Sequence, residues 1–248
     1  MKIQLIRHAS LWLKYRGHTY LVDPMLGGKG GQPPIPNTAN EHRNPLVELP
    51  APANSWAQPD AVLVTHLHPD HWDVSAAELL SKELPVFSQK EDEGVFAAAG
   101  FLHVTPVAEQ AAFGNTTITR TGGQHGTGEI GRQMGPVSGF VLEADEEPSV
   151  YIAGDTIWCE EVKAALDRHR PQFTVVNAGG ARFRVGDAIT MDGEMVAELC
   201  RYAPYTTVIA VHMDAINHCF VTRELLREYL RAEGLEDRVI IPEDGEWV

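Results

Sequence analysis

Short apolar runs rich in Val, Ile, Leu and Thr alternate along the chain with longer segments whose apolar residues recur at helical spacing. The short runs predict strands, and the helical spacing predicts amphipathic helices. The predicted strands cover residues 2–6, 11–15, 19–22, 61–65, 116–121, 139–143, 149–153, 174–176 and 207–211. The predicted helices cover residues 74–80, a segment ending at Ala98, 160–168, 192–202 and 222–232. Two strand-rich halves with helices spread among them predict an α/β (α+β) fold, and a four-layer αββα sandwich fits this order among other α/β folds.

Two segments interrupt this pattern. Residues 27–59 contain four glycines near their start and seven prolines, without any periodicity. A loop of this length in a folded domain is either functional or a plain surface insertion, and its flanks favour a position at the mouth of a site. Residues 122–128, Gly-Gly-Gln-His-Gly-Thr-Gly, lack the Lys and Ser/Thr of a phosphate-binding loop, so their glycines are expected to turn the backbone around His125.

Composition narrows the class of protein. A length of 248 residues with 44% hydrophobic content favours one globular domain over residues 1–248. The net charge of −14 disfavours nucleic acid as a partner. No run is long enough to cross a membrane, and residues 1–8 lack the apolar core of a signal peptide, so a cytoplasmic protein is expected. Cys159, Cys200 and Cys219 are odd in number and far apart, so no disulfide framework is predicted. A homo-oligomer is compatible with these features.

The densest chemical signal follows the predicted strand at residues 61–65. Three imidazoles and two carboxylates lie within the eight residues from His66 to Asp73, and such groups are costly to bury without partners. A divalent cation would supply partners for His66, His68, Asp70 and His71 together, since imidazole and carboxylate ligands suit Zn, Mn and Fe. Asp73 instead begins the next helix, and we expect it to cap that helix.

The sequence H-x-H-x-D-H strongly resembles the signature of the metallo-β-lactamase-fold hydrolases, and four further motifs match in the same order. The five motifs are Asp23 after an early strand, the segment 66–71, His125, Asp155 in Ala-Gly-Asp-Thr, and His212 after a late strand. The match spans roughly residues 3–215. The opening Arg-His-Ala-Ser before a strand hairpin and Asp-Pro looks most like the branch that contains ascorbate-6-phosphate lactonase.

The resemblance implies two divalent metal ions, Zn or Mn or Fe. It implies one ion on His66, His68 and His125, a second on Asp70, His71 and His212, and Asp155 between the two. Three imidazoles leave an open position on a catalytic metal, and paired cations can share an activated hydroxide. The predicted activity is therefore metal-dependent hydrolysis of a small-molecule ester, lactone or phosphodiester. The alternative is an iron-dependent oxygenase or redox enzyme, although the flavin-linked di-iron members usually carry Glu where this chain has His68.

Other polar residues are candidates for roles around the ligands. Asp70 is the candidate for proton transfer, Asp23 for orienting a ligand or simply for capping the turn before Pro24, and His218 for a substrate-facing acid or orienting group. His8 follows the first strand and either approaches the site or is a satisfied core histidine. Two further residues, Arg182 and Arg184, would clamp an anionic substrate if they faced the site, and would otherwise pair with surface acids such as Asp187 and Glu194.

Overall fold

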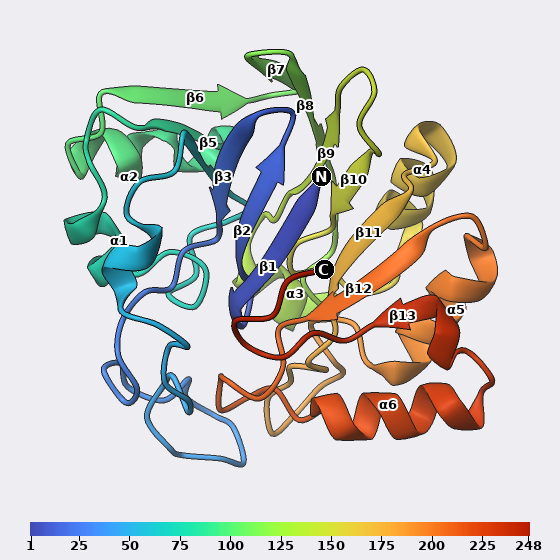
Figure 1. The fold of residues 1–248 in the computed structure, drawn as a ribbon. Coiled ribbons are helices and arrows are strands. Elements are labelled where there is room, and N and C mark those ends of the chain that lie inside the picture. The colour runs from blue at the N-terminus through green and yellow to red at the C-terminus, as the bar shows by residue number, and fades with distance from the viewer.

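Two β-sheets pack face to face with helices on their outer surfaces in the computed structural model, which describes residues 1–248 (Figure 1). The first sheet has six strands in the spatial order β1-β2-β3-β4-β5-β6. They are β1 (Lys2–Arg7), β2 (Ser10–Tyr15), β3 (His18–Val22), β4 (Ala61–Val64), β5 (Pro85–Gln89) and β6 (His103–Val107). The first three strands are antiparallel meander strands, and β3 to β6 are parallel. Parallel neighbours need crossover connections, which here contain α1 (Val74–Leu79) and α2 (Glu93–Ala98).

The second sheet has seven strands in the order β13-β12-β11-β10-β9-β8-β7. They are β7 (Gln110–Phe113), β8 (Thr116–Thr121), β9 (Gly139–Glu143), β10 (Val150–Ile152), β11 (Phe173–Asn177), β12 (Thr207–Val211) and β13 (Val239–Ile240). The strands from β7 to β10 are antiparallel and those from β10 to β13 are parallel. The remaining helices are α3 (Gly128–Met134), α4 (Glu160–His169), α5 (Gly193–Tyr202), α6 (Arg223–Ala232) and the short 3₁₀ helices η1 (Ala53–Trp56), η2 (Lys90–Asp92) and η3 (Glu236–Arg238).

The alternation of side chains along each strand builds the layers. In β4, Leu63 points into the core between the sheets, whereas Val62 and Val64 pack against the outer cluster that includes residues of α1 and α2. In β12, Ile209 faces the same central core, whereas Val208 packs with residues of α4, α5 and α6. The predicted four-layer αββα sandwich is confirmed by this arrangement.

Most predicted elements are present, and the strands at 116–121, 139–143 and 207–211 match β8, β9 and β12 at both ends. The pattern did not predict β5, β6, β7, β13 or α3. The predicted cap is confirmed, since the Asp73 side chain accepts a hydrogen bond from the backbone N–H of Ala76. The three cysteines of the chain are free, and none of the helices is both long and apolar enough to span a membrane.

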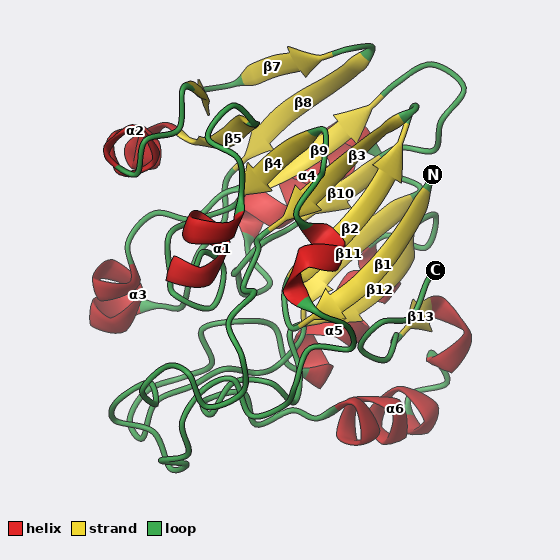
Figure 2. Ribbon diagram, turned by 60° about the vertical axis from the view of Figure 1, so that its left-hand side comes forward, coloured by secondary structure: helices red, strands yellow, loops and turns green.

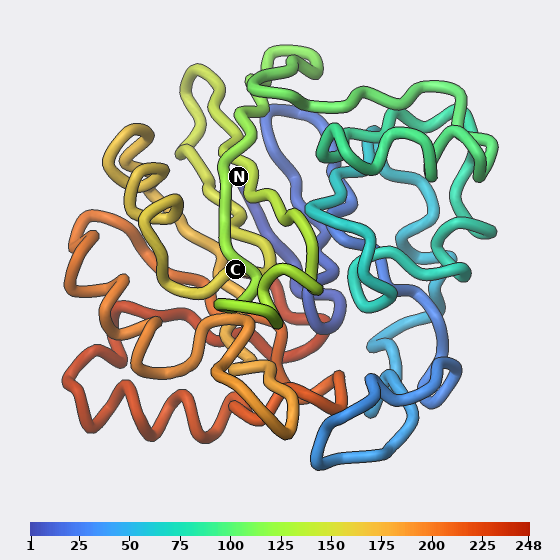
Figure 3. The backbone as a smooth tube through the Cα atoms, turned by 180° about the vertical axis from the view of Figure 1, so that it is seen from behind, coloured from blue at the N-terminus to red at the C-terminus, as the bar shows by residue number.

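The long loops gather at one end of the sandwich (Figure 2). The segment between β3 and β4 contains only η1 and one isolated bridge, Gln32 to Asn44. Seen from behind, this blue segment lies at the same end as the orange segment that follows β11 (Figure 3). The carboxyl ends of several strands open toward this end, and they carry the candidate functional residues.

Candidate metal centre

The candidate ligands follow directly after strands. His66 lies two residues after β4 ends at Val64, Asp155 three after β10 ends at Ile152, and His212 directly after β12. His8 directly follows β1, and His125 lies in the loop after β8. Because these strands run in the same direction within their sheets, their ends meet at one edge of the sandwich. Residues more than a hundred positions apart in the sequence therefore share one site.

The first cluster joins His66, His68, His125 and Asp155, whose candidate ligand atoms all lie within 4.8 Å of one another. Nδ1 of His68 lies 3.0 Å from Nε2 of His66 and 3.3 Å from Nε2 of His125. Oδ2 of Asp155 lies 3.4 Å from Nε2 of His125 and 3.9 Å from Nε2 of His66.

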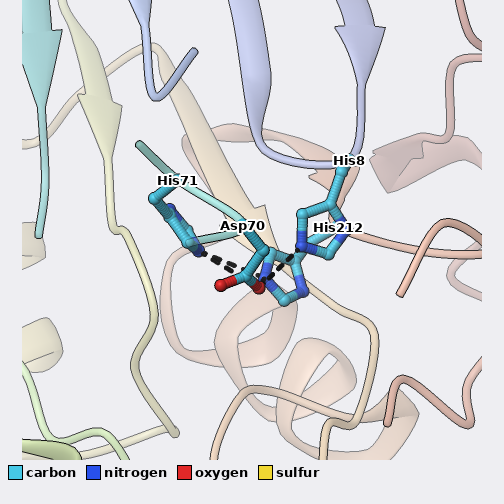
Figure 4. A group of neighbouring side chains, drawn as sticks. All are labelled: His8, Asp70, His71 and His212. Carbon is cyan, nitrogen blue, oxygen red and sulfur yellow. Dashed lines mark hydrogen bonds and ion pairs between the residues drawn. The ribbon is translucent and has the colours of Figure 1, made fainter. Parts of the chain in front are cut away.

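The second cluster joins His8, Asp70, His71 and His212, all of them buried (Figure 4). Oδ2 of Asp70 lies 3.1 Å from Nε2 of His8, 3.6 Å from Nε2 of His212 and 3.9 Å from Nε2 of His71. The Nε2 atoms of His71 and His212 are 3.3 Å apart. The sequence left the role of His8 open. The structure places its imidazole in the site, where the centre of its ring lies 3.6 Å from the centre of the His212 ring.

The carboxylate of Asp155 connects the two clusters. While Oδ2 faces the first cluster, Oδ1 lies 3.3 Å from Nε2 of His71 and 3.2 Å from Nε2 of His212. Gly154 precedes it with a φ of +69°, and a Cβ there would lie 2.6 Å from the carbonyl oxygen of Ser138. Only glycine therefore lets the backbone present Asp155 in this position.

These spacings fit metal ions. Two nitrogen ligands that each lie 2.0–2.1 Å from a tetrahedral zinc ion are about 3.3 Å apart, and the nitrogen and oxygen atoms of each cluster approach this separation. Neutral imidazole nitrogens that face one another share too few protons to satisfy all of them by hydrogen bonds. The donor set of imidazoles and carboxylates also suits Zn, Mn or Fe.

Outer partners fix the orientation of three candidate ligands. Nδ1 of His125 donates to the carbonyl oxygen of Ile189 at 2.8 Å, which directs Nε2 into the first cluster. Nδ1 of His71 lies 2.9 Å from Oδ2 of Asp23, and Nδ2 of Asn177 donates to Oδ1 of Asp155 at 2.6 Å. Such partners are characteristic of metal sites because they select the tautomer that leaves the other nitrogen free.

The backbone is strained at three positions around the site. His8, Asp23 and His212 have φ angles of +61°, +43° and +69°, in the left-handed region that side chains other than glycine rarely adopt. Such strain persists where the surrounding structure determines it, and it is concentrated at functional sites.

Neighbouring groups of opposite charge shift the pKa values of the carboxylates and imidazoles. Burial lowers the pKa of His71, but Asp155, Asp23 and Asp70 outweigh this effect and raise it to about 10. Burial has the opposite effect on an acid and raises the pKa of Asp155, but His212, His71 and His125 lower it well below its usual value. The carboxylate of Asp155 is therefore ionised, and the site favours positive charge beside it.

A small cavity of about 110 Å³ adjoins both clusters, and we call it the metal-centre cavity. Its lining residues are Ile35, His68, Pro69, Asp70, His125, Met134, Asp155, Phe183, Ile189 and His218. It contains no Lys or Arg, and several of the side chains around it are apolar. Ile35 belongs to the loop at residues 27–59, so this loop does border the site.

The structure brings together all seven predicted metal ligands and places the other candidates around them. His218 lines the metal-centre cavity, and Asp23 lies behind His71 rather than in either cluster. Arg182 and Arg184 are not in the cavity wall, and they pair with Asp192 and Glu41 rather than with the acids named from the sequence. The outer partners Asn177 and Ile189 were not predicted, because a lone amide or a backbone carbonyl has no distinctive pattern in the sequence.

Known proteins resemble this chain over nearly its whole length. Residues 18–213 match the family model described as "Beta-lactamase superfamily domain". The UPF0173 protein YddR of Bacillus subtilis (strain 168) is 37% identical over 251 residues, covering 99% of this chain and 98% of the relative. Among solved structures, isothiocyanate hydrolase from Delia radicum gut bacteria is 36% identical with a TM-score of 0.95, covering 100% of this chain and 98% of the other. A possible metal-dependent hydrolase from Veillonella parvula DSM 2008 is 34% identical with a TM-score of 0.97, at the same coverage.

Proposed function

Because the chain belongs to the β-lactamase superfamily and is a metal-dependent hydrolase, we propose that it hydrolyses uncharged isothiocyanates. In this reaction the oxygen of water bonds to the central carbon of R–N=C=S and the bond from that carbon to nitrogen breaks. Both protons of the water end on nitrogen, so that the products are the amine R–NH₂ and carbonyl sulfide. The similarity to a solved isothiocyanate hydrolase supports this choice among electrophilic carbon compounds.

The observation that carries the proposal is the chemistry of the metal-centre cavity. Ile35, Met134, Phe183 and Ile189 give it apolar surface, and it lacks the Lys or Arg side chains that normally bind phosphate or carboxylate groups. An uncharged, compact group with an electrophilic carbon suits such a cavity better than an anion does. Ester or lactone hydrolysis uses the same kind of carbon, whereas a phosphodiester would bring a charge that no cationic side chain of the cavity balances.

We propose that the two clusters each hold one divalent cation, with Asp155 as the shared ligand. His66, His68 and His125 would hold the first ion, and Asp70, His71 and His212 the second, whether zinc, manganese or iron is the native metal. Divalent cations bound there would supply the water-activating and Lewis-acid chemistry that hydrolysis requires.

Asp70 is suited to move the proton. Burial raises its pKa, but His71, His212 and His8 lower it well below the usual value, so the carboxylate is ionised at neutral pH. The imidazole contacts all involve Oδ2, which leaves Oδ1 to accept a proton from water and return it to the leaving nitrogen. We propose that His8 is a positioning residue, which holds Oδ2 by a hydrogen bond from Nε2.

His218 is better suited to orient the substrate than to act as an acid. Burial lowers its pKa to about 4, so that the ring is neutral at pH 7. Its Nδ1 is buried without a hydrogen-bond partner, and the ring lines the metal-centre cavity. A neutral imidazole there can hydrogen-bond the sulfur or nitrogen of the substrate without carrying charge into an apolar wall.

A substrate panel tests the proposal. Protein purified without added metal is first analysed for bound metal and then loaded with zinc, manganese or iron before assays with isothiocyanates, esters, lactones and phosphodiesters. We expect the highest kcat/KM with isothiocyanates, measured as amine release. A clear preference for lactones or phosphodiesters would overturn the substrate assignment. Oxygen consumption by an iron-loaded enzyme would favour the less well supported oxygenase alternative.

A further inference from the structure

A second cavity, of about 560 Å³, lies beside the metal-centre cavity, and we call it the proline groove. Its lining residues are Gly27, Gly28, Gly31, Gln32, Pro33, Pro34, Ile35, Pro36, Pro69, Trp72, Asp73, Val74 and Ser75. Ile35 and Pro69 line both cavities. The two spaces are therefore neighbours, and only these two residues are common to their walls.

The wall of the proline groove offers an apolar surface. Four prolines, Ile35, Trp72 and Val74 give the wall its apolar surface, and Asp73 carries its only ionisable side chain. Its carboxylate is already occupied, since Oδ1 accepts from the N–H of Ala76 and Oδ2 from the N–H of Gly27, both at 2.7 Å. No charged group is left to bind an ion, so a ligand of this groove would be hydrocarbon.

Hydrogen bonds from two buried side chains hold the loop that lines the groove. The guanidinium of Arg7 is fully buried and donates to the carbonyl oxygens of Met25 and Gly27 at 2.9 Å and 2.8 Å. At its other end, Asn217 binds the backbone of Ile35 on both sides: its Oδ1 accepts from the N–H, and its Nδ2 donates to the carbonyl oxygen. A Cβ on Gly27 would lie 2.9 Å from Oδ2 of Asp73, so the close approach of loop and helix cap requires glycine. The groove thus needs little ordering before it binds a ligand.

The sizes of the two cavities indicate that they bind different parts of the substrate. The metal-centre cavity, at about 110 Å³, accommodates a compact reactive group, whereas the proline groove, at about 560 Å³, accommodates a chain or ring. We propose that the proline groove binds the hydrocarbon substituent of the substrate, while the reactive head reaches the metal centre between Ile35 and Pro69. This inference rests on the proposed function and adds that the preferred substrates are isothiocyanates with a substantial apolar substituent.

A chain-length series tests the proposal on the full-length, metal-loaded enzyme. With n-alkyl isothiocyanates from methyl to hexyl, kcat/KM of the wild type should rise by about fourfold for each methylene that is buried. Val74→Asp places a charge in the groove at a side chain that is 72% exposed, so that folding should tolerate it. We expect this variant to lose more than tenfold in kcat/KM for the hexyl compound and much less for the methyl compound. Leu102→Asp is the matched control, because Leu102 is 64% exposed, lies outside the groove and should keep the wild-type series.

Two outcomes would overturn the inference while leaving the proposed function intact. The first is a wild-type kcat/KM that does not depend on chain length, and the second is an equal dependence in Val74→Asp and wild type. If no isothiocyanate is hydrolysed with any metal, the proposed function fails and the groove is tested by binding alone. Tryptophan emission would then be titrated with n-hexanol, since Trp72 lines the groove. A change that is present in wild type and in Leu102→Asp but weakened in Val74→Asp supports the groove, and equal or absent binding in all three rejects it.

Discussion

Oδ2 of Asp23 lies 2.9 Å from Nδ1 of His71, so that Asp23 supports the metal centre from behind without joining either ligand cluster. The same carboxylate accepts hydrogen bonds from the backbone N–H and the hydroxyl of Thr65, at 2.7 Å each. It therefore connects the end of β4, which carries His66, to the imidazole of His71. Both roles considered from the sequence, orientation and local capping, had placed Asp23 outside the ligand set.

Asp23→Asn should weaken metal binding without unfolding the protein. The amide NH₂ would face Nδ1 of His71 and favour the tautomer with a proton on Nε2, which points toward Asp155 and His212. Loss of such an outer partner typically costs 10–100-fold in metal affinity or activity, and we expect about that range here. Competition with a chromogenic chelator measures the affinity. Asp60→Asn, which alters an exposed carboxylate bound to the N–H of Thr19, is the control, and an equal effect of both changes would contradict the role of Asp23.

Removal of a candidate ligand should separate metal binding from folding. His66→Ala should lose about one bound ion per chain, whereas Asp155→Ala should reduce both, because its two oxygens face different clusters. Both variants should lose hydrolysis. Asp73→Ala should keep its metal content and lose about 1 kcal/mol or more of unfolding free energy, as expected for a missing helix cap. Elemental analysis and urea unfolding measure the two properties, and full metal content in His66→Ala would refute the ligand assignment.

The sequence predicted the elements with the strongest local patterns. Thr116–Thr121 and Thr207–Val211 are rich in β-branched residues, and they form strands with the predicted bounds. In contrast, β7 contains two alanines and lies at the edge of its sheet, and α3 begins at a glycine and buries no side chain, so neither leaves a clear periodicity. β5 begins with Pro85, which strands accept at their first position but which a pattern search treats as a break.

The candidate site was predictable to a similar degree. Its imidazoles and carboxylates stand at strand ends in a recognisable order, and the structure brings them together. Their outer partners depend on contacts that only the fold creates, such as the carbonyl oxygen of Ile189, 64 positions from His125. The position of His8 against Asp70 also depends on the register between β1 and the rest of the first sheet, and the sequence alone left it ambiguous.

The pH dependence of stability in the metal-free protein should include a contribution from His218. Burial lowers its pKa from 6.5 to about 4, so the unfolded chain takes up a proton at higher pH than the native state does. Stability from this group is present above pH 6.5 and is lost as the pH falls toward about 4. Between pH 7.5 and pH 5 the loss should be about 2 kcal/mol. Urea unfolding of wild type and His218→Gln at both values measures it. His218→Gln should show a smaller pH dependence of stability than wild type. His42→Gln, a change at an exposed position, should show the same pH dependence as wild type.

Charge reversal at Arg182 should leave substrate binding intact. Its side chain is 43% exposed and lies 3.9 Å from Oδ2 of Asp192, and it is absent from the walls of both cavities. We therefore expect Arg182→Glu to change KM by less than about twofold, because an exposed pair of this kind contributes little. A large rise in KM with unchanged metal content would restore the idea of a cationic clamp and would point to an anionic substrate.

Asn217 joins the segment after His212 to the loop at residues 27–59. Its side chain bonds to Ile35, Thr38, Asn40 and Asn44, and it is 1% exposed. Asn217→Ala leaves several loop polar groups without a partner and should cost about 1–3 kcal/mol of unfolding free energy.

In the same variant, Ile35 loses the contacts that hold it between the metal-centre cavity and the proline groove. KM should therefore rise, and more for long-chain than for short-chain isothiocyanates, because the groove is no longer held in its binding shape. Metal content should remain unchanged, since no candidate ligand bonds to Asn217 in the structure. Asn54→Ala, in η1 of the same loop and exposed, is the control for a general effect of loop substitution. If KM in Asn217→Ala equals that of the control while stability falls, the loop is a passive insertion whose order does not matter for substrate binding.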